Sequence, residues 1–275
     1  MIDLIKAIIF GIVQGITEWL PISSTGHMIL LDEFIHLNVT DSFMEMFRVV
    51  IQFGSILAVV VLFWKKIFPF DLNKKLSIKK DIFSMWFKII VACIPAAIIG
   101  LAFDEKIDKI FYNWQVVSIM LIFFGIVFIA VEYKNEGKKP KINTLSEITY
   151  TTAILIGIFQ LIAAVFPGTS RSGATIVGAL LIGVSRTVAA EFTFFLAIPV
   201  MLGASLLKVL KFGFDFTGNE LLILAIAMIT AFIVSVLVIK FLMNYIKKHD
   251  FKVFGWYRIV LGILVIIYFA IQSLR

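Results

Sequence analysis

The stretch WLPISSTGHM (residues 19–28) interrupts a run of apolar residues that extends from residue 4 to residue 35. The stretch FPGTSRSGAT (residues 166–175) interrupts a second apolar run, 153–184, in the same way. Neither half of either run reaches the roughly 17–25 residues that a helix needs to cross the hydrocarbon core. Irregular backbone persists at membrane depth only where protein or a water cavity satisfies it. Each run is therefore predicted to be a re-entrant helix hairpin.

The rest of the chain has the composition of a membrane protein. Of its 275 residues 61% are hydrophobic and 16% are charged, whereas soluble domains average about 45–50% and about 25%. This difference excludes the water-soluble classes. The single cysteine, Cys93, excludes an intramolecular disulfide framework. Six further segments are long and apolar enough to span, or nearly so: 47–64, 87–103, 114–131, 188–211, 221–243 and 257–271. The predicted fold is an all-α polytopic transmembrane bundle with six full spans and the two re-entrant hairpins.

Lysine placement predicts how the chain is oriented. Lysines gather in three loops, 65–81, 132–152 and 244–256, whereas residues 32–46 carry acids and no lysine or arginine. Because short cytoplasmic loops are enriched in lysine and arginine, these three loops are predicted to be cytoplasmic and both chain ends to lie outside. The net charge of +7 is thus a property of membrane loops, and no nucleic-acid partner is expected.

The two interrupted runs resemble each other. At an offset of 146, seven of the fifteen positions from Ala7 to Pro21 are identical, including Gly11, Gln14 and Pro21. One hairpin and three crossings in each half would place the second hairpin on the face opposite to the first. The chain is therefore predicted to be a single membrane domain, residues 1–275, built as an inverted repeat with halves 1–140 and 141–275. Duplicated hydrophobic filler is the alternative.

The first hairpin carries the residues of an anion site. Gln14 and Glu18 are four residues apart and share one helical face. Charges at membrane depth cost roughly 2.5–3.5 kcal/mol and mark functional candidates, which applies to Glu18 and His27. The hydroxyls and backbone N–H groups near a new helix start can bind an anion, and here they belong to Ser23, Ser24, Thr25 and Gly26. A helix cap with a turn is the structural alternative.

The second hairpin repeats this plan around an arginine. A guanidinium between hydroxyls suits bidentate phosphate contacts, and Arg171 lies among Thr169, Ser170 and Ser172. A buried ion pair of Arg171 with Glu18 or Glu191 is the alternative to a phosphate site.

Two further charged residues are weaker candidates. Glu191 is expected to neutralise Arg171 or Arg186. Arg48, near the outer end of a span, is expected to extend to the surface.

These motifs resemble those of the undecaprenyl-diphosphatase family of the bacitracin-resistance type. The resemblance rests on GIVQGITEWLPISSTGHMIL (11–30), VVIQFGSILAVVVLFW (49–64), PGTSRSG (167–173) and AAEFTFFLAIPVMLGAS (189–205). It implies a bacterial plasma-membrane enzyme that removes the terminal phosphate of undecaprenyl diphosphate, regenerating the lipid carrier for cell-wall synthesis, at a site open to the periplasmic face. The implied partners are the polyprenyl diphosphate lipid and the bilayer, and a homodimer is compatible with the sequence.

The resemblance also assigns roles to residues. The family's acidic element falls on Gln14 and Glu18, its Ser-Ser-Thr-Gly-His motif on Ser23 to His27, and its phosphate-binding arginine on Arg171. With the hydroxyls around that arginine, the predicted catalytic set is Glu18, Ser23, Ser24, His27 and Arg171, and the predicted substrate-binding set is Gln14, Thr25, Gly26, Thr169, Ser170 and Ser172. Position 14 is Gln where many members have Glu, so a divalent cation (Mg²⁺ or Ca²⁺) has one carboxylate fewer, and no metal ligand is assigned.

Several routes and functions stay open from the sequence. His27 or a serine is expected to be the nucleophile, unless His27 activates water, and Glu18 is expected to orient or deprotonate His27 or to hold the cation. A secondary transporter or a lipid-phosphate flippase is the alternative function, because inverted repeats with broken helices are typical of transporters.

Overall fold

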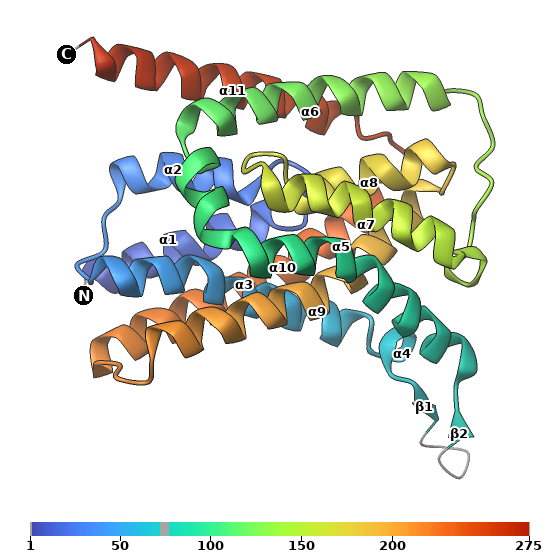
Figure 1. The fold of residues 1–275 in the computed structure, drawn as a ribbon, viewed down its shortest axis with the longest axis horizontal. Helices are drawn as coiled ribbons and strands as arrows, with labels where there is room; N and C mark the ends of the chain where they lie inside the picture. Colours follow the sequence, from blue (N-terminus) through green and yellow to red (C-terminus); the bar gives the residue numbers. More distant parts are fainter. Residues whose placement is uncertain (1, 72–76, 275) are drawn as a thin grey trace.

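Six helices are long and apolar enough to cross a membrane, as the sequence predicts. In the computed structural model, which describes residues 2–71 and 77–274, each contains most of one predicted span. They are α3 (Asp41–Leu62), α5 (Lys80–Phe111), α6 (Trp114–Asn135), α9 (Arg186–Phe212), α10 (Gly218–Tyr245) and α11 (Lys252–Ser273). The chain is thus a multi-pass membrane protein that is almost wholly helical (Figure 1).

Four shorter helices form two helix–turn–helix units. These are α1 (Ile2–Thr17) with α2 (Ser24–Phe34), and α7 (Tyr150–Val165) with α8 (Arg171–Ile182). At 16 residues each, α1 and α7 are about 24 Å long, which is less than the roughly 30 Å of the hydrocarbon core. Both helices end shortly before a proline, Pro21 or Pro167, because proline cannot donate a helical hydrogen bond.

The two units enter the bundle from opposite ends. Figure 1 shows α1 starting, and α2 finishing, near the end of the bundle where both chain termini lie. The α7–α8 unit starts and finishes near the other end. The lysine-rich connections, 136–149 among them, also lie at that other end (Figure 1). The arrangement therefore separates the lysine-rich connections from the two termini.

Two parts of the chain differ from the prediction. Residues 104–111 continue α5 instead of forming a loop. The apolar part of the sequence ends at Phe103, so the helix extends beyond the apolar span. The connection after α3 holds the short α4 (Trp64–Ile67) and a two-stranded antiparallel pair, β1 (Phe70–Asp71) and β2 (Ser77–Ile78). Lys74 and Lys75 of the predicted loop lie outside the described residues.

The short helices pack between the long ones. Helix α1 lies on α10, and α7 lies on α5, so the first helix of each unit contacts a long helix from the other half of the chain. Helices α6 and α11 form a pair along one side (Figure 1), and α6 contacts both α2 and α8. A one-turn 3₁₀ helix, η1 (Leu145–Glu147), precedes α7. The turns of both units are thereby enclosed within the bundle.

Small residues allow these helices to approach closely. A Cβ atom added to Gly157 of α7 would lie 2.3 Å from the carbonyl oxygen of Ala92 in α5, and one added to Gly11 of α1 would lie 2.5 Å from that of Ala227 in α10. Such contacts are typical of helix packing in lipid, where association depends on van der Waals contact. Side chains larger than hydrogen are therefore excluded at both crossings.

We expect Gly157→Ala to lower the free energy of unfolding by about 1–3 kcal/mol, the usual cost of overpacking a tight contact. The matched control is Gly100→Ala. Gly100 lies in α5, the helix on which Gly157 packs, and a Cβ atom added to it meets nothing within 4 Å. Thermal unfolding of the purified protein in detergent measures both. Equal midpoints for the two variants would contradict the predicted close crossing.

Candidate functional site

The two turns meet inside the bundle, and each ends on a strained serine. Ser23 has a φ of 74° and Ser170 a φ of 68°, the only positive values at non-glycine positions in the described parts of the chain. Each hydroxyl caps the helix that follows: Ser23 Oγ accepts from the N–H of Gly26 at 3.4 Å, and Ser170 Oγ from that of Gly173 at 3.1 Å. Such outliers cost about 1–3 kcal/mol and cluster at functional sites. Both N-termini, of α2 and α8, are thus fixed by the same local structure.

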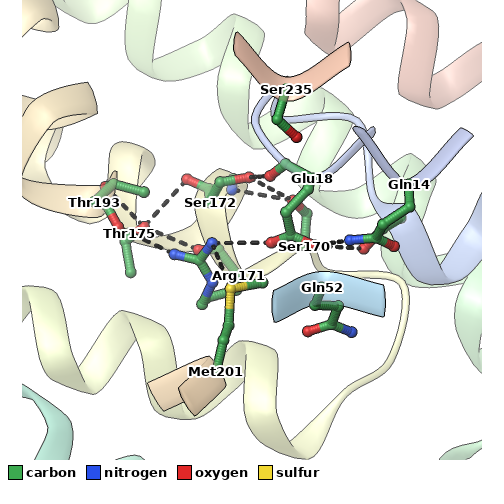
Figure 2. A network of polar contacts seen from close by, with 12 residues as sticks. Gln14, Glu18, Gln52, Ser170, Arg171, Ser172, Thr175, Thr193, Met201 and Ser235 are labelled. Atoms are coloured by element: carbon green, nitrogen blue, oxygen red, sulfur yellow. Dashed lines mark hydrogen bonds and ion pairs between the residues drawn. The ribbon is translucent and has the colours of Figure 1, made fainter. Parts of the chain in front are cut away.

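An ion pair joins the two turns. Arg171 Nη2 lies 2.9 Å from Glu18 Oε1, and both side chains are largely buried. The other carboxylate oxygen, Oε2, accepts from Gln14 Nε2 at 3.0 Å and from Ser24 Oγ at 3.4 Å. Figure 2 shows Gln14, Glu18 and Arg171 in a row, with Gln52 of α3 beside them. The buried ion pair of Arg171 with Glu18, the alternative that the sequence left open beside a phosphate site, is therefore present.

The arginine is held from several sides. Its Nη1 donates to the carbonyl oxygen of Thr193 at 3.1 Å, and its Nη2 lies 3.9 Å from Sδ of Met201. The guanidinium also lies 6.0 Å from the ring of Trp19, within the range of a cation–π contact. Its Nε has no hydrogen-bond partner among the described residues. The guanidinium is therefore fixed in place and keeps one donor free.

Serine hydroxyls surround the ion pair. Ser172 Oγ donates to the backbone carbonyl of Glu18 at 3.2 Å and lies 3.2 Å from Ser170 Oγ. The bond to Glu18 crosses from the second turn to the first, and the contact with Ser170 lies within the second turn (Figure 2). Together with Ser24, they place three hydroxyl groups close to one carboxylate and one guanidinium.

His27 belongs to a neighbouring group and is not bonded to Glu18. Its Nδ1 lies 2.7 Å from the carbonyl oxygen of Ser23, and its Nε2 lies 2.7 Å from the hydroxyl of Tyr257. The two rings are stacked, with centroids 5.6 Å apart. Because a carbonyl only accepts, Nδ1 carries the proton and Nε2 accepts from the tyrosine. The expectation that Glu18 orients His27 is corrected: Ser23 and Tyr257 orient it instead.

Sequence reasoning missed Arg258 of α11. Its side chain is fully buried, and it donates to the carbonyl oxygens of Pro21 at 3.3 Å, Gly168 at 3.0 Å and Thr169 at 2.6 Å. The signal was an arginine one residue inside the last apolar segment, a position typical of an arginine that extends to the membrane surface. The three carbonyls belong to the two turns, so Arg258 contacts both.

The remaining charged candidates pair differently from the expectation. Glu191 bonds to Lys66 of α4 at 2.7 Å, and Arg186 forms two-point contacts with Glu132 of α6. Arg186 is the first residue of α9 and lies against the end of α6, whereas Glu191 is five residues further along and faces α4. The expected pairing of Glu191 with Arg171 or Arg186 is therefore wrong.

The other predicted residues lie at the edges of the site. Thr169 is buried, and its Oγ1 has no hydrogen-bond partner in the described ranges. Thr25 is half-buried, and Gly26 takes part through its backbone N–H. Arg48 does not simply extend to the surface, because it forms an ion pair with Asp32.

Comparison with known proteins places the chain in a family. The family model described as bacitracin resistance protein BacA matches residues 7–264. The chain belongs to the BacA family. It is 67% identical to the undecaprenyl-diphosphatase of Desulfitobacterium hafniense, over 100% of this chain and 99% of that protein. It is 69% identical to undecaprenyl-diphosphatase 1 of Clostridium acetobutylicum and 63% identical to an undecaprenyl-diphosphatase of Enterococcus faecalis, in each case over 98% of both chains.

In this BacA-family chain we expect Arg171→Met to lower the free energy of unfolding by about 3–5 kcal/mol, because it leaves the buried Glu18 carboxylate unpaired. The double variant Glu18→Gln/Arg171→Met should recover part of that loss, since neither charge then remains. Chemical or thermal unfolding in detergent measures the coupling.

The control for these variants is Glu45→Gln. It breaks the ion pair of Glu45 with Lys208, and the Glu45 side chain is 58% exposed. Exposed pairs contribute about 0–1 kcal/mol, so this variant should unfold almost like wild type. Additive effects of the two buried substitutions would show that Glu18 and Arg171 do not interact.

Proposed function

We propose that the chain hydrolyses undecaprenyl diphosphate to undecaprenyl phosphate and inorganic phosphate, and thereby recycles the lipid carrier and confers bacitracin resistance. The names of its close full-length relatives and its family support this activity. The observation that carries the proposal is the Arg171 guanidinium, held by Glu18 and the Thr193 carbonyl among the hydroxyls of two helix N-termini. Preorganised donors of this kind stabilise charge on a transferring phosphoryl group.

Ser24 is the hydroxyl whose contacts best suit a nucleophile. Its Oγ donates to Glu18 Oε2 at 3.4 Å, whereas the hydroxyl of Ser23 is buried and accepts from a helix N–H. In the proposed step Oγ attacks the terminal phosphorus and gives its proton to Glu18. The bond from that phosphorus to the bridging oxygen breaks, and undecaprenyl phosphate leaves.

His27 then serves the second half of the reaction. Its Nε2 accepts a hydrogen bond in the structure, so it can take a proton from the water that hydrolyses the phosphoserine. Ser170 and Ser172, with the N–H groups at the start of α8, bind the phosphate oxygens beside Arg171. Gln14 fixes the carboxylate of Glu18 through its amide.

A divalent cation would have to share its ligands with the substrate. The described residues contain no group of three or more His, Cys, Asp or Glu side chains that could hold a metal. Magnesium is commonly bound by one or two carboxylates together with substrate phosphates, and Glu18 with the amide oxygen of Gln14 fits that pattern. These two residues would hold Mg²⁺ or Ca²⁺, which would neutralise phosphate charge.

The membrane placement follows from the same proposal. Both hairpins are re-entrant, and the halves 1–140 and 141–275 form an inverted repeat in one domain; support comes from the short α1 and α7 and their entry from opposite ends. The lysine-rich connections face the cytoplasm, and the site opens to the periplasmic face of the bacterial plasma membrane. The lipid tail lies among the long helices, and the protein is compatible with a homodimer.

We expect purified wild-type protein in detergent to release phosphate from a polyprenyl diphosphate. Arg171→Ala should lower kcat by about 10²–10³-fold, the usual loss when one transition-state donor is removed, and His27→Ala by about 10²–10⁴-fold. A chelator should abolish turnover, and added Mg²⁺ or Ca²⁺ should restore it.

The control is Glu45→Gln, whose exposed carboxylate lies in another ion pair. No phosphate release from well-folded wild-type protein would contradict the proposal. In that case the transporter and flippase alternatives predict ion-coupled uptake or lipid movement in vesicles.

We further expect a rapidly quenched reaction of His27→Ala to accumulate phosphate on Ser24, because attack on phosphorus precedes the step that needs His27. Mass spectrometry of the digested protein detects the modified peptide. Ser24→Ala should show no modification and no turnover. Burst-free kinetics with an unmodified Ser24 would instead indicate direct attack by water.

A further inference from the structure

We infer that Arg258 of α11 is a positioning residue that sets the two hairpin turns relative to each other. The inference rests on the proposed function, since it concerns the same site. Arg258 is 0% exposed, and its two terminal nitrogens donate to Pro21 in the first turn and to Gly168 and Thr169 in the second. One guanidinium thus bonds to both turns of the site.

The partners of Arg258 are carbonyl groups, and none of its ion-pair or hydrogen-bond contacts in the described residues is with a carboxylate. Phe124 and Phe128 of α6 lie 5.8 Å and 6.0 Å from the guanidinium. A charge placed in such surroundings is expensive in a membrane. Carbonyl groups at helix breaks are also expensive when they lack donors. The guanidinium and these carbonyls therefore satisfy one another's hydrogen bonds.

Only an arginine fits this role. The guanidinium is a planar fork of donors, whereas a lysine ammonium is a compact charge on a flexible stem. The three acceptors lie in two separate turns, and the fork reaches them all at once. A Cβ atom added to Gly173 would lie 2.7 Å from Arg258 Nη1, so the guanidinium lies directly against the first turn of α8. That helix start carries the Ser170 and Arg171 side chains.

The preceding residue extends the same control to the histidine. Tyr257 bonds to His27 Nε2 at 2.7 Å, so two consecutive residues of α11 contact three parts of the site. The helix itself is fixed nearby: Cβ atoms added to Gly125 or Gly255 would lie 2.7 Å and 2.8 Å from the other's carbonyl oxygen. This close crossing fixes the position of α11 relative to α6, and with it the positions of Tyr257 and Arg258.

We test the inference with Arg258→Lys, which keeps the charge and removes the fork. The expected result is a loss in kcat of about 10²-fold, as for a misplacement near 1 Å, with KM changed by less than about threefold. Hydrogen exchange by mass spectrometry should show faster exchange in both turns, residues 18–26 and 166–174. The matched control is Arg48→Lys, an arginine of α3 that pairs with Asp32 and lies outside the proposed machinery.

A second variant keeps the test independent of losing the arginine. Gly173→Ala retains the arginine in the sequence, but the added Cβ atom displaces the Nη1 atom of Arg258. This variant should therefore also speed hydrogen exchange in both turns. Faster exchange in one turn alone, unchanged exchange in both variants, or an equal effect of Arg48→Lys would overturn the inference. Wild-type protein without turnover, in which the turns still respond as expected, would contradict the proposed hydrolysis and leave the positioning role standing.

Discussion

The ion pair between Glu18 and Arg171 is the contact on which the rest of the site depends, because it closes two helix breaks against each other. Broken backbone inside a membrane needs protein partners for its N–H and C=O groups. Joined by this pair and by the Ser172 hydroxyl on the Glu18 carbonyl, the turns supply partners to one another. The same polar side chains that form the candidate site therefore also hold the two turns together.

The two turns share a backbone plan and differ in chemistry. Ser23 and Ser170 adopt the same unusual conformation and the same capping role. Around that common plan, the first turn presents the carboxylate of Glu18 and the imidazole of His27, and the second presents the guanidinium of Arg171. The strain at the serines is the cost of aiming these groups inward, and a more relaxed turn would place them elsewhere.

Much of this arrangement could be predicted from sequence, because it depends on local patterns. The spans follow from apolar length, the helix breaks from Pro21 and Pro167, and the hydroxyl-rich surroundings of Arg171 from its neighbours in the sequence. The partners of His27 and the role of Arg258 could not be predicted, since they come from α11, more than two hundred residues away from the first turn. The pairing of Glu191 was mispredicted for the same reason: hydropathy locates a helix in the chain but does not specify which way each face points. The extension of α5 past Phe103 shows a further limit, because apolar length marks the membrane core and not the end of the helix.

The crossing of α1 on α10 has a consequence for how the protein is made. Helix α1 ends at Thr17, and the surface that receives Gly11 belongs to a helix that begins at Gly218. A ribosome synthesises the first segment long before the second, so the contact between Gly11 and Ala227 can form only after α10 has been made. Helix α7 has no such delay, because its partner α5 is already synthesised. A nascent chain that lacks α10 would therefore leave α1 without the long helix on which it packs.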